Sequence, residues 1–154
     1  MKKSQIFSIC TIALAALGII LYMFLDAIKA SGLLGDVSYS GLQVMFGKSD
    51  KTGLGTVVYL KFSFLLFLGF IFAIAGLVIT ILPMAGVKFK VFPIIAICCF
   101  VVAALFAFLS KTCAVAGNGD MGMDGFNLAA GAILGGIFYI CAGVTSALPI
   151  VLKD

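Results

Sequence analysis

Four long stretches of this chain contain no Asp, Glu, Lys, Arg or His, and together they cover most of its 154 residues. A helix needs about 20 mostly apolar residues to cross the hydrocarbon layer of a bilayer. Only helices and closed barrels satisfy their backbone hydrogen bonds in lipid. The sequence therefore predicts an all-α membrane protein, a bundle of four transmembrane helices. The uncharged stretches hold 22, 26, 20 and 28 residues and lie between Lys3 and Asp26, Lys61 and Lys88, Lys90 and Lys111, and Asp124 and Lys153.

The expected boundaries follow from these stretches. Because the chain is 64% apolar, little of it remains outside the spans, and we expect one membrane domain over residues 1–154. A short inner loop joins the second and third spans. The spans are expected at about residues 5–25, 60–82, 93–109 and 128–151, with outer loops at 26–59 and 110–126.

The positions of the lysines predict an orientation. Five lysines fall at the two termini and the short second loop, opposed by one aspartate, and five fall in the other loops, opposed by five aspartates. The first group is concentrated in short segments next to the spans, where the positive-inside rule applies. We therefore expect a multi-pass protein of the plasma (inner) membrane with both termini cytoplasmic. Of the five cysteines, only Cys113 is expected to face outward.

The first outer loop carries strand-like patterns. Leu42, Val44 and Phe46 alternate with Gln43 and Met45, and residues 56–59 are rich in strand-forming side chains. The polar segment between them, residues 47–53, has glycine at both ends. This pattern predicts a small extracellular β-hairpin that leads into the second span, although half of its length could instead be helical.

We expect this hairpin to form the recognition surface, because loops held by a rigid scaffold commonly carry binding residues. The spans would then serve as the scaffold. The candidate partner-binding residues are Leu42, Val44, Phe46, Lys48, Asp50 and Lys51.

Each expected span has one face of small residues, which allows helices to approach closely in lipid. The fourth span has the widest such face and is expected to contact two neighbours. Tyr139 lies within it and should find a hydrogen-bond partner, with Thr80, Thr11 or a backbone carbonyl as the options. The faces comprise Ser8, Thr11, Ala15, Gly18 and Tyr22; Gly69, Ala73, Gly76 and Thr80; Ala96, Cys99, Ala103, Ala107 and Ser110; and Ala129, Ala132, Gly136, Gly143 and Ala147.

The composition argues against most chemistry. The ten basic residues are all lysine, and histidine is absent, so the commonest general base is missing. The expected spans contain no ionisable group that could carry a proton or an ion. No basic stripe suited to nucleic acid is present. We therefore expect no enzyme activity, no cofactor and no nucleic-acid partner.

The second outer loop offers a calcium hypothesis. Asp120 and Asp124 lie in a glycine-rich segment that partly resembles a calcium-binding loop. Counted from Asp120, the third ligand position is Gly122 and the twelfth is Gly131, so two expected oxygen ligands are missing. A flexible glycine-rich turn is the alternative, and Asp124 or Asn127 could equally cap the fourth span.

The layout as a whole resembles the claudin-like tetraspan arrangement. An inner N-terminus, a long first outer loop with strand character and a short inner turn are shared with it. Residues 40–47 occupy the place of that family's Gly-Leu-Trp strand, with Gln43 in the position of the tryptophan and no cysteine pair in the loop. The layout is also similar to small four-span membrane proteins of bacteria.

Two functions are compatible with the sequence. The first is a non-enzymatic tetraspan that lies in the lipid bilayer and uses its outer loops to bind lipid or a protein, which could be a second copy of the same chain. The alternative is a channel or permease subunit that forms a pore by oligomerisation. Thr11, Thr80, Thr145 and Ser146 could line such a path, although hydroxyls in spans more often bond to helix carbonyls.

Overall fold

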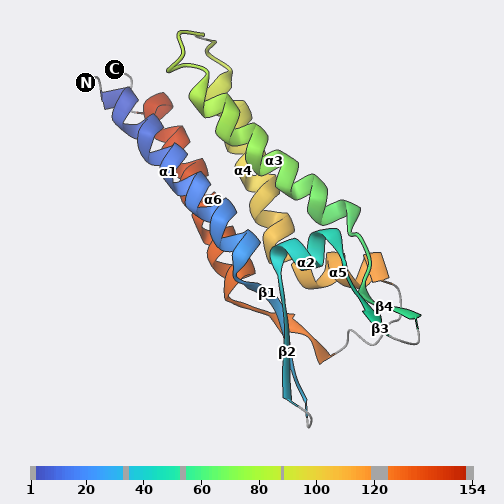
Figure 1. The fold of residues 1–154 in the computed structure, drawn as a ribbon. Coiled ribbons are helices and arrows are strands. Elements are labelled where there is room, and N and C mark those ends of the chain that lie inside the picture. The colour runs from blue at the N-terminus through green and yellow to red at the C-terminus, as the bar shows by residue number, and fades with distance from the viewer. Residues whose placement is uncertain (1–2, 33–34, 53–54, 88, 119–124, 152–154) are drawn as a thin grey trace.

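Four long helices lie side by side in the computed structural model, which describes residues 3–32, 35–52, 55–87, 89–118 and 125–151 (Figure 1). The first and last described residues, Lys3 and Val151, lie at the same end of the bundle, called the terminal end here. Strands and short helices form a head at the opposite end, made from the described residues of 26–60 and 110–129. The four helices are α1 (Lys3–Phe24), α3 (Phe64–Ile81), α4 (Phe92–Phe108) and α6 (Ala130–Val151).

The helix boundaries agree with the predicted spans, with two differences. Helices α1, α3 and α6 are each long and apolar enough to cross a membrane. Helix α4 reaches that length only together with α5 (Ser110–Asn118), from which it is bent by 70°. The segment from Ser110 to Asn118 was expected to be loop, so this part of the second outer loop is helical instead. Helix α3 also begins later than expected, because a strand continues to Leu60.

The small-residue faces predicted from the sequence form the helix contacts. Helix α6 packs against both α1 and α4, and α3 packs against α4. A Cβ atom added to Gly69 would lie 2.5 Å from Phe106 Cβ, and one added to Gly135 would lie 2.9 Å from Tyr22 Cβ. Glycine is therefore required where these backbones approach large side chains.

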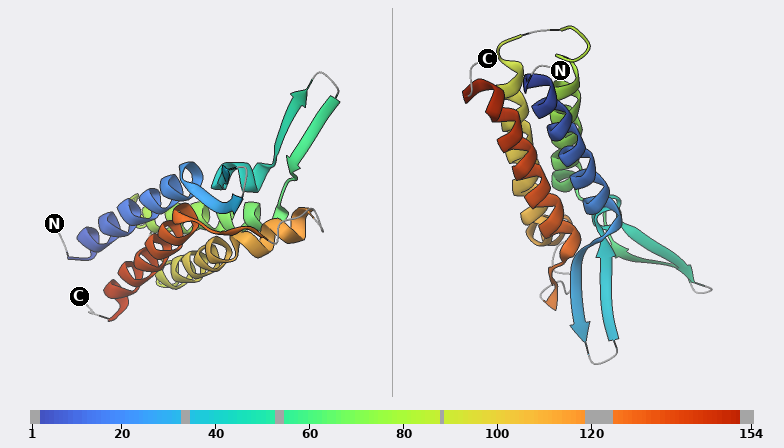
Figure 2. Two further views of the ribbon diagram at one scale, coloured as in Figure 1. Left: turned by 90° about the horizontal axis from the view of Figure 1, so that it is seen from below. Right: turned by 90° about the vertical axis from the view of Figure 1, so that its left-hand side faces the viewer.

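The head contains two antiparallel hairpins that project away from the helices (Figure 2). One is formed by β1 (Asp26–Gly32) and β2 (Gly35–Ser40), and the other by β3 (Lys48–Thr52) and β4 (Gly55–Leu60). The two-residue strand β5 (Asn127–Leu128) pairs with β1. The sheet β2-β1-β5 thus joins residues 26–40 to residues 127–128, which are far apart in the sequence.

The predicted hairpin is correct for residues 56–59 but wrong for residues 42–46. Residues Gly41–Phe46 form the short helix α2. Ser40 caps it, with its side chain accepting from Gln43 N–H while the Gln43 side chain accepts from Ser40 N–H. Gly41, Val44 and Met45 are buried, which is the i, i+3, i+4 spacing of one side of a helix. The capping box and the helical spacing of buried residues therefore outweigh the apparent alternation.

The head is fixed to the bundle by buried hydrogen bonds at the start of α3. Ser63 is 1% exposed, its N–H donates to Met45 O at 2.9 Å, and its hydroxyl donates to Cys113 O at 3.1 Å. One serine thus connects α2, α3 and α5. Gly47 permits the connection from α2 to β3, because its φ is 88° and an added Cβ would lie 2.7 Å from Leu60 O.

Candidate functional site

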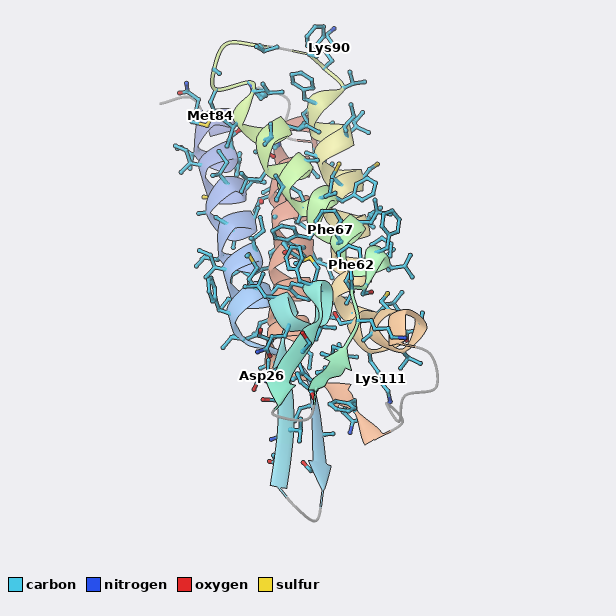
Figure 3. The ribbon with its side chains drawn as sticks, turned by 45° about the vertical axis from the view of Figure 1, so that its right-hand side comes forward. Asp26, Phe62, Phe67, Met84, Lys90 and Lys111 are labelled. Atoms are coloured by element: carbon cyan, nitrogen blue, oxygen red, sulfur yellow. The ribbon has the colours of Figure 1, made fainter. Side chains whose placement is uncertain are left out.

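The bundle contains an open cavity of about 780 Å³ at the terminal end. The helix pairs α1–α6 and α3–α4 diverge toward this end in Figure 1, and the cavity lies between them. Figure 3 shows Met84 and Lys90, two of its lining residues, at this end of the molecule. All four long helices and the α3–α4 loop contribute to its wall.

The cavity brings together the four hydroxyl residues that the sequence suggested for a path. Thr11, Thr80, Thr145 and Ser146 all line it. Thr11 Oγ1 donates to Thr145 Oγ1 at 2.8 Å, joining α1 to α6. The Thr80 hydroxyl donates to Gly76 O at 2.8 Å. The hydroxyls of Thr11, Thr80 and Thr145 are therefore engaged with one another or with helix carbonyls, as serine and threonine in helices commonly are.

The cavity ends at a packed layer near the middle of the bundle. Ala15 and Phe100 are fully buried and pack with Ala142 in one core cluster. Along its helix, each of these three residues lies about one turn closer to the head than a cavity-lining residue. An added Cβ on Gly76 would lie 2.9 Å from the Phe100 ring, so α3 also closes on this layer. The cavity is consequently closed toward the head.

Tyr139 lies on the head side of this layer, away from the threonines expected to be its partners. It is 3% exposed and borders a very small void that is also lined by Tyr22 and Phe106. Thr80 and Thr11 bond elsewhere, as described above. Of the three options for its partner, the two threonines are therefore ruled out, because the Ala15–Phe100 layer separates them from Tyr139, and the backbone carbonyl stays a prediction.

The candidate partner-binding residues of the head have different environments. Val44 is fully buried and Leu42 is half-buried against the core, so both pack within the molecule. Phe46 is 52% exposed. Lys48 Nζ lies 5.6 Å from the centroid of the Tyr39 ring. Asp50 and Lys51 lie on β3, and their side chains are outside the described part of the structure.

Phe46 belongs to an aromatic cluster that the sequence reasoning missed. Its ring centroid lies 5.9 Å from that of Phe67 and 6.4 Å from that of Phe62, and Phe62 is itself 47% exposed. Figure 3 shows Phe62 and Phe67 close together near the start of α3, and their ring centroids lie 5.6 Å apart. Phenylalanines are frequent throughout the second span, so no sequence signal distinguished these from the others.

The β1–β2 hairpin carries an ion pair, which sequence reasoning also missed. Lys29 Nζ lies 3.2 Å from Asp36 Oδ2, and both side chains are about half exposed. A hydrogen bond from Ser31, followed in importance by the ammonium group of Lys29, lowers the pKa of Asp36 below its ordinary value. Lys29 and Asp36 are seven residues apart in the sequence, and it is the pairing of β1 with β2 that brings them into contact.

The calcium hypothesis falls on residues 119–124, so Asp120 and Asp124 lie outside the described residues. Within the described ranges, no group of three or more acidic, cysteine or histidine side chains could hold a metal ion. The cysteines of this part of the chain are all free. Cys113 is in the head, but it is 4% exposed and therefore does not present its thiol to solvent.

No known protein family matches this chain, and no curated protein or solved structure is significantly similar to it. The likeness to claudin-like tetraspans therefore remains a resemblance of layout. Helix α2 departs from that layout, since it occupies the segment compared with the family's Gly-Leu-Trp strand.

Proposed function

We propose that this chain is a non-enzymatic, multi-pass membrane protein whose head binds a partner protein. The four long helices would cross the plasma membrane. Helix α4 would form the third crossing, and α5 would continue it beyond the bend. Lysine placement favours a cytoplasmic terminal end and a head on the outer side. The large apolar residues on the outer faces of the helices, such as Ile20, Ile71 and Val144, would then contact lipid.

One observation supports a binding role for the head above all others. The head is more than a set of connections: it has its own sheet, its own capped helix and a core shared with the helix ends. Ile28, Met45 and Leu60 are at most 2% exposed although they come from three different head elements. Such a fixed base holds the projecting hairpins in defined positions, as loops that bind partners require.

The β3–β4 side of the head is the proposed contact surface. The exposed rings of Phe46 and Phe62 lie at its base, and Lys48, whose ammonium group lies over the Tyr39 ring, begins strand β3. Aromatic side chains flanked by polar groups are typical of the centre of protein interfaces. Val44, which is buried, is not part of this surface.

The test replaces residues 48–52 by a Gly-Ser linker of the same length in the full chain. The variant should keep its helix content and thermal unfolding in detergent but lose the partner that co-purifies from native membranes. The matched control replaces residues 31–36 at the tip of the other hairpin and should retain that partner. Two differently tagged copies expressed together would reveal whether the partner is a second copy. Retention of the partner after the 48–52 replacement would contradict the proposal.

A channel or permease subunit is the second candidate, because four hydroxyl residues line one cavity. In that function the Ala15–Phe100 layer would act as the barrier, and a smaller side chain should open it. Phe100→Ala should then increase solute flux into vesicles that contain the purified protein, and Thr145→Val should alter it. A binding protein predicts no flux in either variant and normal partner binding by Thr145→Val.

A further inference from the structure

We propose that the terminal-end cavity binds one anionic membrane lipid, with an acyl chain between the helices and the phosphate group beside Lys90. This inference rests on the proposed membrane placement but is independent of what the head binds. The cavity volume of about 780 Å³ falls within the range of roughly 300–1,000 Å³ found for small-molecule sites. It accommodates part of a lipid, with the remainder outside the mouth.

The wall of the cavity suits a hydrocarbon chain better than a polar solute. Its apolar part comes from residues such as Ile79, Pro93 and Ala96. Its threonine hydroxyls direct their protons to other protein atoms: Thr80 to Gly76 O, and Thr145 to Cys141 O at 3.0 Å. A polar solute needs hydrogen-bond partners in place of lost water, whereas methylene groups need none. Hydroxyls that already have hydrogen-bond partners therefore offer few bonds to a polar solute. An acyl chain placed beside them leaves no polar group unpaired.

The closed inner end supports a bound molecule over a passing one. The fully buried Ala15 and Phe100 side chains stop the cavity near mid-bundle. An acyl chain that enters from the terminal end would terminate against this layer. The cavity thus has a floor and a partly apolar wall, which suits one chain of an amphiphile.

The mouth carries the charge that selects an anionic head group. Lys90 is the charged residue among the lining residues, and no carboxylate is present among those the structure describes. It lies in the loop segment Val87–Phe92, where lysines alternate with apolar residues. Phe89 and Val91 are 61% and 54% exposed. Exposed apolar side chains alternating with lysine are suited to the boundary between acyl chains and anionic head groups.

The experiment measures lipid binding to the purified full chain by native mass spectrometry. Phosphatidylglycerol and phosphatidylcholine with identical chains are added separately to detergent-solubilised protein. We expect one tightly held phosphatidylglycerol and weaker retention of phosphatidylcholine. Lys90→Gln should weaken phosphatidylglycerol binding about fivefold, the factor that corresponds to about 1 kcal/mol for one lysine near an anionic lipid. Lys90→Arg should preserve the binding.

A second pair of variants locates the acyl chain. Ser8 lines the cavity, so Ser8→Phe should fill it and abolish the tightly held lipid. Ile9 is its neighbour on α1 but is 43% exposed on the outside of the bundle, so Ile9→Phe should have no effect. Circular dichroism and gel filtration verify that each variant is folded. If Ser8→Phe does not fold, the Lys90 pair and the lipid comparison decide alone.

Three results would overturn the inference. They are equal binding of the two lipids, unchanged binding in both Ser8→Phe and Lys90→Gln, and equal loss in Ser8→Phe and Ile9→Phe. The first two would indicate an adventitious lipid on the outer surface only. A failure of membrane placement is separately visible, because the protein would then be absent from the membrane fraction before any lipid is added.

Discussion

The hydroxyl of Tyr22 lies 3.0 Å from Ser110 Oγ, and this contact joins α1 to the start of α5 where the bundle meets the head. Both residues are buried, at 4% and 0% exposure. Ser110 also lies 2.6 Å from Ala107 O, to which it can donate. Ser110 Oγ also lies 3.4 Å from Phe106 O, so the serine has two carbonyl partners besides Tyr22. The contact with Ser110 is the hydrogen bond that the structure gives the Tyr22 hydroxyl.

This asymmetry predicts unequal effects of two small substitutions. Ser110→Ala leaves the Tyr22 hydroxyl buried without its partner and should destabilise the protein by about 1–3 kcal/mol. Tyr22→Phe leaves Ser110 bonded to Ala107 and should cost only about 1 kcal/mol. Thermal unfolding in detergent checks the order. The double variant should resemble Tyr22→Phe, and a larger effect of Tyr22→Phe than of Ser110→Ala would contradict this account.

Two glycines in the helix contacts should respond in opposite directions to alanine. A Cβ at position 69 would meet Phe106 Cβ at 2.5 Å, an atom fixed to the backbone, so Gly69→Ala should destabilise the bundle by about 1–3 kcal/mol. A Cβ at position 143 would lie 3.7 Å from Phe100 Cβ, which is ordinary contact. Gly143→Ala should therefore be neutral or stabilising by up to about 1 kcal/mol. Equal unfolding temperatures for the two variants would show that the contacts are wrongly assigned.

The proposed orientation can be tested by labelling engineered cysteines. The native Cys113 is unsuitable because it is buried. Ser38 is exposed on β2, and Val87 is 41% exposed in the α3–α4 loop. A membrane-impermeant maleimide added to intact cells should label Ser38→Cys and should label Val87→Cys only after lysis. The unmodified chain serves as the control for background labelling, and the reverse pattern would place the head in the cytoplasm.

The Lys29–Asp36 ion pair predicts a pH dependence confined to the β1–β2 hairpin. Because the folded chain lowers the pKa of Asp36, the ionised carboxylate strengthens the hairpin above the ordinary aspartate pKa of about 4. This contribution is lost as the pH falls through the lowered pKa. Protection of the hairpin amides from hydrogen exchange should therefore decrease at acidic pH, and the decrease should be absent in Asp36→Asn.

A charge-removal variant gives a direct check on the cause. Lys29→Gln should raise the pKa of Asp36 toward its ordinary value but not fully, because the hydrogen bond from Ser31 remains. Carboxyl chemical shifts measured by NMR during a titration report this pKa. No change in Lys29→Gln would mean that Ser31 alone accounts for the shift.

The helices were predictable because their determinants are periodic and continuous in the sequence. The uncharged runs predicted four long helices, and the small residues predicted their buried faces, including Gly69 and Gly76 on α3. Burial follows from local spacing alone in these cases, since a helix places residues three and four apart on one side.

The head and the cavity were less predictable because they depend on contacts between distant segments. The alternation from Leu42 to Phe46 predicted a strand, while the capping partners Ser40 and Gln43 were present but not recognised as a helix start. Strands β1 and β5 pair Ile28 with Leu128, and no local sequence pattern predicts this pairing. The sequence grouped Thr11, Thr80 and Thr145 as residues that could line a path, but the divergence of the helix pairs is what places them around one cavity.

The packing of α6 against α1 constrains how the chain is made. Within this chain, helix α1 is synthesised long before its principal neighbour α6, which is the last helix in the described residues. Until synthesis is nearly complete, the small-residue faces of α1 and α4 lack their partner, and strand β1 lacks β5. The bundle and the β1–β5 pairing can therefore be completed only after residues 127–151 have been made, and a nascent chain interrupted before Ala130 would expose these unpaired faces.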